Sequence, residues 1–260
     1  PVTLSGGGMF PMGDDMKLMK GRIRFDASAG RVRYPLLGTT LDLGRTKGEV
    51  LISPQWVVVD KMMGTIWDGT FTGRILAQID DGDALNGSFV LQDMNLTSIG
   101  KSYDKKMEKA TVHGAIEFSS KGGNMNSIQA KGEAALVHGD LVEIPLFGFL
   151  GEALSNYIPG LGHLINYKIS RADCDFSIEK GYVRTSNFAA QGSNMSLEGG
   201  GWIRLSDLQV NSDFKLGLRG LPGFITSPVF LLAGGLFQVR GTGPLSNVSW
   251  NFAPFSGGKA

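Results

Sequence analysis

Short stretches of alternating apolar and polar residues cover most of the chain, and this is the pattern of half-buried β-strands. The clearest alternation runs from Leu208 to Arg219, long enough for a strand of about 35 Å at the usual rise per residue. Strands with one apolar face must bury that face against something. The pattern therefore predicts a mostly β protein with a long curved antiparallel sheet that forms an open groove or a sandwich-like structure.

Turn signals separate the predicted strands. Asp68-Gly69 lies between β-prone segments and is a strong hairpin signal, and Lys180-Gly181 follows a second alternating segment. These pairs predict that consecutive strands are joined by tight turns and lie antiparallel.

A weak internal repeat is visible in the pattern Leu-x-Asp-apolar-x-apolar, which occurs at residues 91–96 and again at 205–210. We therefore expect one β domain over residues 1–260, with related parts at about 50–131 and 167–250. The chain opens at Pro1 without an initiator methionine, so we expect it to be a piece excised from a longer protein.

One segment interrupts the β pattern near the middle of the chain. Between residues 146 and 158 the apolar residues recur at steps of three and four, which predicts a short amphipathic helix, and Pro159-Gly160 ends it. A second apolar turn of helix is possible at 161–165. The apolar face of the first helix must cover a sheet, plug an opening or meet a lipid or partner. This face consists of Leu146, Phe147, Leu150, Leu154, Tyr157 and Ile158.

Composition narrows the class of protein. The 38 glycines and the 19% of charged residues suit tight turns and a large apolar surface rather than a helical bundle. The formal net charge of +1 gives no reason to expect a nucleic-acid partner. Cys174 is the single cysteine, so an internal disulfide is impossible, and its neighbouring carboxylates raise the pKa of the thiol and argue against a reactive thiolate.

No motif for catalysis or cofactor binding stands out. His113, His138 and His163 lie 25 residues apart, which is unlike the spacing of zinc ligands. Residues 80–83 hold three carboxylates but lack the distal glutamate of a calcium loop, so a polar turn is favoured. A nucleophile elbow and a Walker loop are absent from the sequence. We expect no cofactor, no metal and no enzymatic activity, while paired acids that meet only in the fold stay open.

Two segments suggest contact with membranes or anionic partners. Residues 221–237 contain no charge, but proline and glycine interrupt them, which favours a buried or membrane-touching segment over a membrane span. Arg22, Arg24, Arg31 and Arg33 form the densest basic cluster. This cluster is either a solvated face or a contact for anionic headgroups or polysaccharide.

The order of these features resembles the C-terminal domain of AsmA-like proteins, a bacterial envelope family with TamB-type and bridge-like relatives. The matching segments are 67–73, 85–96, 132–147, 175–181, 195–205 and 239–248. The resemblance implies an open, groove-like sheet with an apolar interior, in the periplasm of a double-membraned bacterium. It also implies a role in lipid traffic or outer-membrane maintenance for a parent protein anchored in the inner membrane.

On this reading the protein is a non-enzymatic lipid-binding or lipid-transfer domain near a membrane, and its partners are phospholipid or other acyl lipids and other envelope proteins. The predicted helix over 146–158 caps or gates one end of the groove. The apolar strand faces hold the acyl chains, through Phe71, Ile75, Phe89, Leu91, Leu208, Val210, Phe214, Leu216 and Leu218.

Other classes stay open. The same strand faces are plain core in a closed β structure. A β-sandwich adhesin or carbohydrate-binding module presents aromatic residues such as Trp56, Trp67 or Trp202 on its surface. A β-rich hydrolase requires acids that converge in a cleft.

Overall fold

The computed structural model describes residues 2–9, 20–28, 30–34, 39–79, 84–102, 109–121, 125–137, 142–143, 168–193, 195–218, 236–245 and 247–254. In this part of the chain the protein is mostly β, with the single α-helix α1 (Leu96–Ser102) and a short 3-10 helix at Met125–Ser127. The strands of the first half are β1 (Val2–Met9), β2 (Lys20–Ala27), β3 (Gly30–Tyr34), β4 (Thr39–Ile52), β5 (Trp56–Ile66), β6 (Gly69–Gln78), β7 (Leu85–Asn95), β8 (Thr111–Ser120) and β9 (Gln129–Val137). Those of the second half are β10 (Val142–Glu143), β11 (Lys168–Glu179), β12 (Tyr182–Gly192), β13 (Met195–Arg204), β14 (Gln209–Leu218), β15 (Leu236–Pro244) and β16 (Ser249–Pro254).

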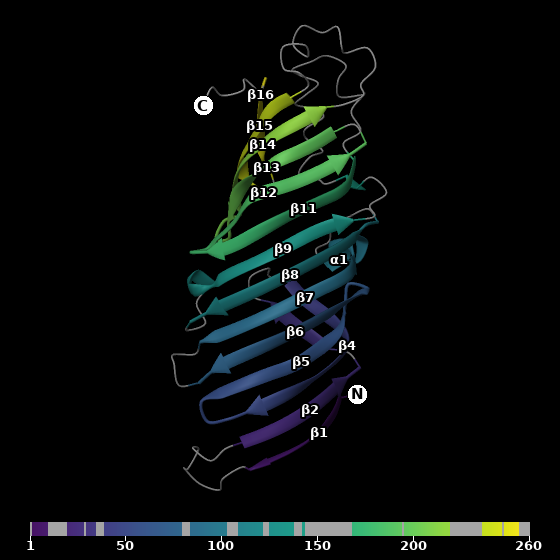
Figure 1. Ribbon diagram of the computed structural model, residues 1–260, viewed down its shortest axis with the longest axis vertical. Helices are drawn as coiled ribbons and strands as arrows, with labels where there is room; N and C mark the ends of the chain where they lie inside the picture. The colour runs from purple at the N-terminus through teal and green to yellow at the C-terminus, as the bar shows by residue number, and fades with distance from the viewer. Residues whose placement is uncertain are drawn as a thin grey trace. The chain divides into compact units, whose positions relative to one another are not determined.

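The strands follow one another along an antiparallel sheet almost in sequence order (Figure 1). The path of hydrogen-bonded neighbours runs β1-β2-β4-β5-β6-β7-β8-β9-β11-β12-β13-β14-β15-β16, while β3 pairs with β4 and β10 with β11. Within the described residues this path has two ends, so the sheet is open. The predicted long antiparallel sheet is confirmed.

The chain divides into two compact units. Unit 1 comprises residues 1–106, 111–133 and 177–181, and unit 2 comprises residues 107–110, 134–176 and 182–260. The two copies of the repeated motif take different local structures, because residues 91–95 lie in β7 whereas residues 205–208 form the turn between β13 and β14. The single domain with two related parts stays a prediction.

Both hairpin signals coincide with tight turns. Trp67 and Asp68 join β5 to β6 with φ values of 50° and 60°, and Lys180 and Gly181 join β11 to β12 with φ values of 52° and 77°. Two successive residues with positive φ define a type I′ turn, whose twist matches that of the flanking strands. In the first turn the tight pair lies one residue before the expected Asp68-Gly69.

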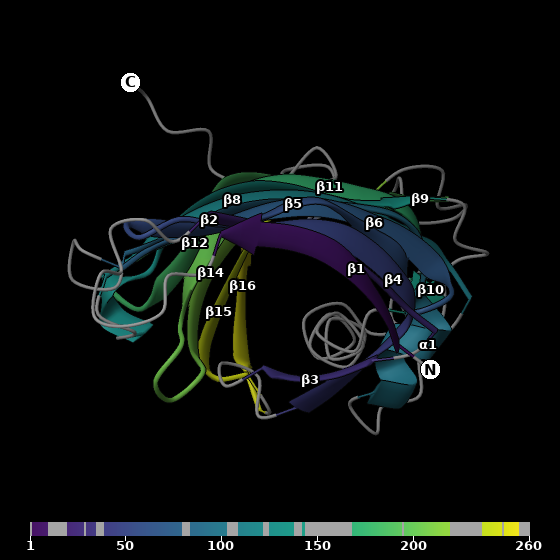
Figure 2. The same cartoon turned by 90° about the horizontal axis from the view of Figure 1, so that it is seen from below.

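The strands of unit 1 curve, and Figure 2 shows α1 and β3 on the concave side of this curve. Bulges provide a local cause. The pairing shifts between Val59 and Met62 in β5 and between Leu91 and Met94 in β7, and each extra residue bends its strand. Lys61 and Asp93, which lie in these bulges, have positive φ values of 50° and 55°.

Unit 2 has its own apolar cluster on one face of β11 to β16. Leu197, Leu216 and Val239 are at most 1% exposed, and Phe237 and Phe252 pack with them. Cross-strand register places these residues side by side, since Leu216 pairs with Leu197 on β13 and with Phe237 on β15. The face is therefore the core of this unit.

Helix α1 follows β7 directly and was not predicted from the sequence. The side chain of Asn95 accepts a hydrogen bond from the backbone N–H of Thr97 at 2.9 Å, which is an N-cap interaction that ends β7 and starts the helix. The helix predicted over 146–158 and the uncharged segment at 221–235 lie outside the described residues. Within the described ranges, no helix has both the length and the apolar character that crossing a membrane requires.

Candidate functional site

The concave side of unit 1 carries a continuous apolar face, which we call the inner face. Cross-strand pairing aligns one residue from each of six strands into a row that crosses the sheet. All six are half-buried, so they line the concave side without being enclosed. The row consists of Ile23, Val50, Val59, Ile75, Gly87 and Phe118.

Phenylalanine rings on the inner face lie over glycines of the neighbouring strand. A Cβ added to Gly48 would lie 2.8 Å from Phe25, and the corresponding distances are 2.8 Å for Gly64 and Phe71 and 2.6 Å for Gly87 and Phe118. Gly73 is in the same relation to the ring of Phe89. In each case the two residues are direct cross-strand partners: Phe25 and Gly48, Gly64 and Phe71, Gly73 and Phe89, Gly87 and Phe118.

This arrangement shapes the inner face. Because glycine has no side chain, each ring lies down across the neighbouring strand and covers its backbone. The rings also contact one another: the centroids of Phe71 and Phe89 are 6.5 Å apart, and the rings of Phe89 and Phe118 are parallel at 6.2 Å. The result is a shallow aromatic floor on the concave side of unit 1.

Helix α1 closes one side of the inner face. Ile99 packs against a cluster that contains Ile66, Phe71 and Met94, each at most 6% exposed. The indole Nε1–H of Trp67 donates a hydrogen bond to the hydroxyl of Ser102 at 3.0 Å, which ties the helix to the β5–β6 turn. Phe71 is therefore part of a small core at this side.

The sequence-predicted lipid-contacting residues fall into three groups. Ile75, Phe89 and Leu91 are half-buried on the inner face, whereas Phe71 is 5% exposed at its edge. Val210, Phe214, Leu216 and Leu218 are buried in unit 2, and Leu208 is 49% exposed in a turn, where its φ is 55°. The gate residues Leu146, Phe147, Leu150, Leu154, Tyr157 and Ile158 lie outside the described residues.

Phe25, Phe118 and the glycines beneath the rings were not among the residues predicted from the sequence. A signal for part of this set is present: Phe71-Thr-Gly73 and Gly87-Ser-Phe89 place a phenylalanine and a glycine on one face of neighbouring strands. Counting outward from the β5–β6 turn also pairs Gly64 with Phe71. The pairing of Phe25 with Gly48 joins strands that are not consecutive, so local counting does not find it.

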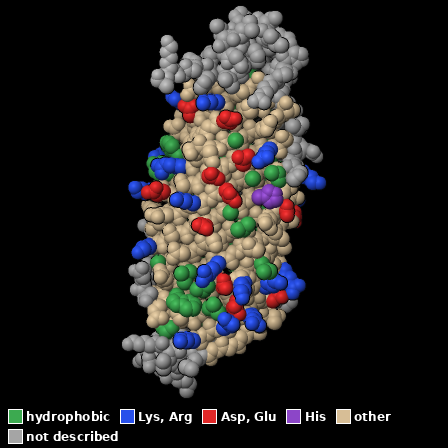
Figure 3. Space-filling model, viewed as in Figure 1, with side chains coloured by type: hydrophobic (Ala, Val, Ile, Leu, Met, Phe, Trp, Pro, Cys, Tyr) green, Lys and Arg blue, Asp and Glu red, His purple; other side chains and the backbone are tan. Residues whose placement is uncertain are grey.

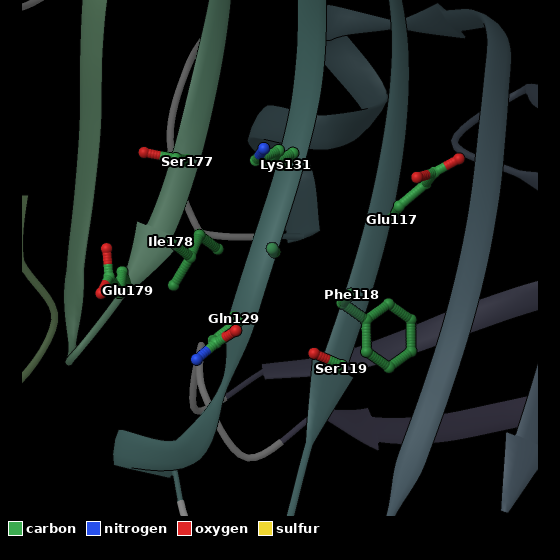
Figure 4. A pocket seen from close by; sticks show the side chains of 9 residues that line it. Glu117, Phe118, Ser119, Gln129, Lys131, Ser177, Ile178 and Glu179 are labelled. Carbon is green, nitrogen blue, oxygen red and sulfur yellow. The ribbon is translucent and has the colours of Figure 1, made fainter.

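Two hollows lie on the opposite, outer face of unit 1. One, of about 370 Å³, lies over β8, β9 and β11, where Glu117, Lys131 and Glu179 come from three different strands (Figure 4). The other, of about 410 Å³, lies over β1, β2, β4 and β5 and is rich in arginine and lysine.

Reactive groups do not gather in the described part of the chain. Its side chains include no group of three or more His, Cys, Asp or Glu placed to hold a metal ion. His113 accepts a hydrogen bond from the backbone N–H of Asp93 at 3.3 Å. Burial, followed by the nearby Asp175 and Asp173, raises the pKa of the Cys174 thiol, as its sequence context predicted.

The tryptophans do not form a shared aromatic platform in unit 1, because Trp56 and Trp67 lie at opposite ends of β5. In unit 2 the ring of Trp202 packs edge-on against Tyr182, with centroids 5.4 Å apart. No protein-family model, curated protein or solved structure matches the chain.

Proposed function

We propose that the chain is a non-enzymatic lipid-binding and lipid-transfer domain of a bacterial cell envelope, and that the inner face of unit 1 holds acyl chains. The observation that carries this proposal is the continuous row of half-buried apolar residues on a concave sheet face, with phenylalanine rings laid over glycines. A protein in water needs a partner for a concave apolar face of this extent.

The chemistry of the inner face suits a hydrocarbon chain. From β4 to β8, the described residues in register with Val59, Ile75 and Phe89 are apolar or glycine, whereas the charged residues of these strands project from the outer face. Each methylene removed from water contributes about 0.8 kcal/mol. An acyl chain that lies along the aromatic floor therefore gains affinity without needing a polar contact.

The open sheet supports transfer rather than storage. Within the described residues the path of strands has two ends, and a concave face on such an open sheet suits movement of lipid along it. The resemblance to AsmA-like proteins supports a periplasmic location, with outer-membrane lipid homeostasis or assembly as the process served. Phospholipids are the acyl lipids expected to be most abundant there.

The test is native mass spectrometry, with lipid extraction, on protein purified without detergent. We expect phospholipid adducts on the wild-type protein. The variant Ile75→Asn should lose them several-fold, because it places an amide at the centre of the apolar row. Ile75 suits this purpose because it is half-buried, whereas a polar residue at Leu216 would unfold the core of unit 2.

Leu208→Asn is the matched control. It makes a similar change at an exposed turn position, where asparagine tolerates the positive φ of 55°, and it should keep the wild-type adducts. Circular dichroism establishes that both variants are folded. A clean apo mass together with no uptake of a fluorescent phospholipid would reject lipid binding and leave a scaffold role for the sheet.

A further inference from the structure

A basic hollow occupies the outer face of unit 1, on the side of the sheet opposite to the inner face. Its volume is about 410 Å³, and its floor is formed by strands β2, β4 and β5. Arg22 and Arg24 of β2 are 60% and 71% exposed, and Lys47 and Lys61 add two exposed ammonium groups from β4 and β5. Four cations thus surround one depression.

The carboxylates of the hollow are already engaged by arginines. Glu49 lies between Arg22 and Arg24, with N–O distances of 3.4 and 3.3 Å, and is only 8% exposed. The guanidinium of Arg45 donates two hydrogen bonds to Asp26, at 3.0 and 2.7 Å.

Positive charge is therefore concentrated here. Strands β2 and β4 to β6 together carry seven described cations and four carboxylates, a surplus of three positive charges in a chain whose formal net charge is +1. The cations are Lys20, Arg22, Arg24, Arg45, Lys47, Lys61 and Arg74, and the carboxylates are Asp26, Asp42, Glu49 and Asp60.

Apolar side chains lie directly beside these cations. Register places Arg22 next to Leu51, Leu51 next to Val58, and Val58 next to Leu76, so an apolar row continues from the basic hollow across three strands. On the same face of β5, two residues before Val58, Trp56 is 37% exposed. Figure 3 shows apolar side chains gathered on one side of this part of the surface and charged side chains on the other.

We propose that this basic and apolar patch docks unit 1 onto the surface of an anionic phospholipid membrane. The cations face the phosphate groups of the lipid headgroups, and Trp56 enters the interfacial region beside them. A membrane surface fits this patch because it alone offers clustered phosphates and an apolar layer a few ångströms beneath them. Tryptophan is well suited to that boundary, since its ring is apolar and its N–H is polar.

The test is flotation of the purified chain with vesicles of phosphatidylcholine, compared with vesicles in which about a third of the lipid is phosphatidylglycerol. We expect binding to the anionic vesicles only, and weaker binding as added salt screens the charges. The double variant Lys47→Gln/Lys61→Asn should weaken this binding about tenfold or more, because each cation near an anionic surface contributes about a fivefold effect. Trp56→Ser should weaken it further.

These positions leave the ion pairs of Glu49 intact, and asparagine suits the φ of 50° at Lys61. The control is Lys131→Gln/Lys180→Gln, which removes two exposed lysines elsewhere in unit 1 and should bind as the wild-type chain does. Ile75→Asn should also keep vesicle binding, so docking and acyl-chain binding are separable.

Three results would overturn the proposal. Equal binding to neutral and anionic vesicles would show that charge plays no role. Equal loss of vesicle binding in Lys47→Gln/Lys61→Asn and in the control Lys131→Gln/Lys180→Gln would show that the basic hollow plays no role. If inorganic phosphate, at a concentration equal to that of the lipid phosphate, displaces the protein from the vesicles, the hollow is instead a site for the free anion.

Discussion

Adding one methyl group at Gly73 tests whether the glycines hold the rings of the inner face in place. In Gly73→Ala the new Cβ overlaps the ring of Phe89, so the ring must leave its position across β6. A displaced Phe89 ring loses its packing on Phe71 and on Phe118. Gly73 is a strand residue without positive φ, so its backbone conformation suits alanine, although the new Cβ would also lie 2.8 Å from the backbone oxygen of Ser88.

The expected magnitude follows from two opposing effects. Each lost aromatic pair costs about 0.5 to 1.5 kcal/mol, and two pairs are disturbed. Replacing glycine by alanine restricts the unfolded chain and returns about 0.4 to 1 kcal/mol. We therefore expect Gly73→Ala to lower the free energy of unfolding by about 1 to 2 kcal/mol, within the range measured for overpacked sites.

Gly114→Ala is the control on the same face. A Cβ at Gly114 lies 3.3 Å from the backbone oxygen of Glu133 and 4.0 Å from Leu91, so no ring has to move. We expect this variant to be neutral or slightly stabilised. Urea unfolding followed by circular dichroism and fluorescence compares the midpoints.

A double-mutant cycle identifies the cause. In a Phe89→Leu background the ring is absent, so Gly73→Ala should cost about 1 kcal/mol less than it does in the wild-type chain. Equal stability of Gly73→Ala and Gly114→Ala, or no coupling between Gly73 and Phe89, would refute the reasoning.

Two further predictions concern unit 2 and helix α1. Burial alone raises the pKa of Asp213, but hydrogen bonds from Gln238 at 3.0 Å and Arg240 at 2.9 Å outweigh it and hold that pKa below its usual value. Ionised Asp213 therefore stabilises the fold at pH values above the pKa of an unfolded carboxyl group, and this contribution is lost as the pH falls through the folded pKa. We expect Asp213→Asn to be less stable than the wild-type chain at pH 5 and equally stable at pH 2. Urea unfolding midpoints measured between these pH values test this expectation. Ser102→Ala removes the hydrogen bond from Trp67 and should lower the local stability of α1 by about 1 kcal/mol. Amide hydrogen exchange should then be faster in α1 and unchanged in β14.

The hairpin turns and most strands were predictable because their signals are local. The glycine of Lys180-Gly181 favours a tight turn with positive φ, and the alternation around Phe214 assigns side chains to two faces of a strand. Helix α1 was missed because Leu96 continues an apolar run, although Asn95 is a strong N-cap residue and was the available signal.

The partners of each strand were harder to predict. Strand β4, for example, continues from Thr39 to Ile52 and pairs with both β2 and β3 along one side. Such pairing joins residues that are distant along the chain. The alternation of apolar and polar residues within one segment does not encode which other segment it pairs with.

Contacts between distant segments also decide how accessible an apolar face is. The alternation therefore predicted the apolar faces but not their exposure to solvent. Ile75 on β6 and Leu216 on β14 have equivalent patterns in the sequence, yet Ile75 is half-buried and Leu216 is 1% exposed. Leu216 owes its burial to Leu197 and Phe237, which come from other strands and pack against it. Period-2 alternation states which residues share a face, whereas accessibility depends on what packs against that face from elsewhere in the chain. A polar substitution at Leu216 therefore tests stability, while the same substitution at Ile75 tests binding.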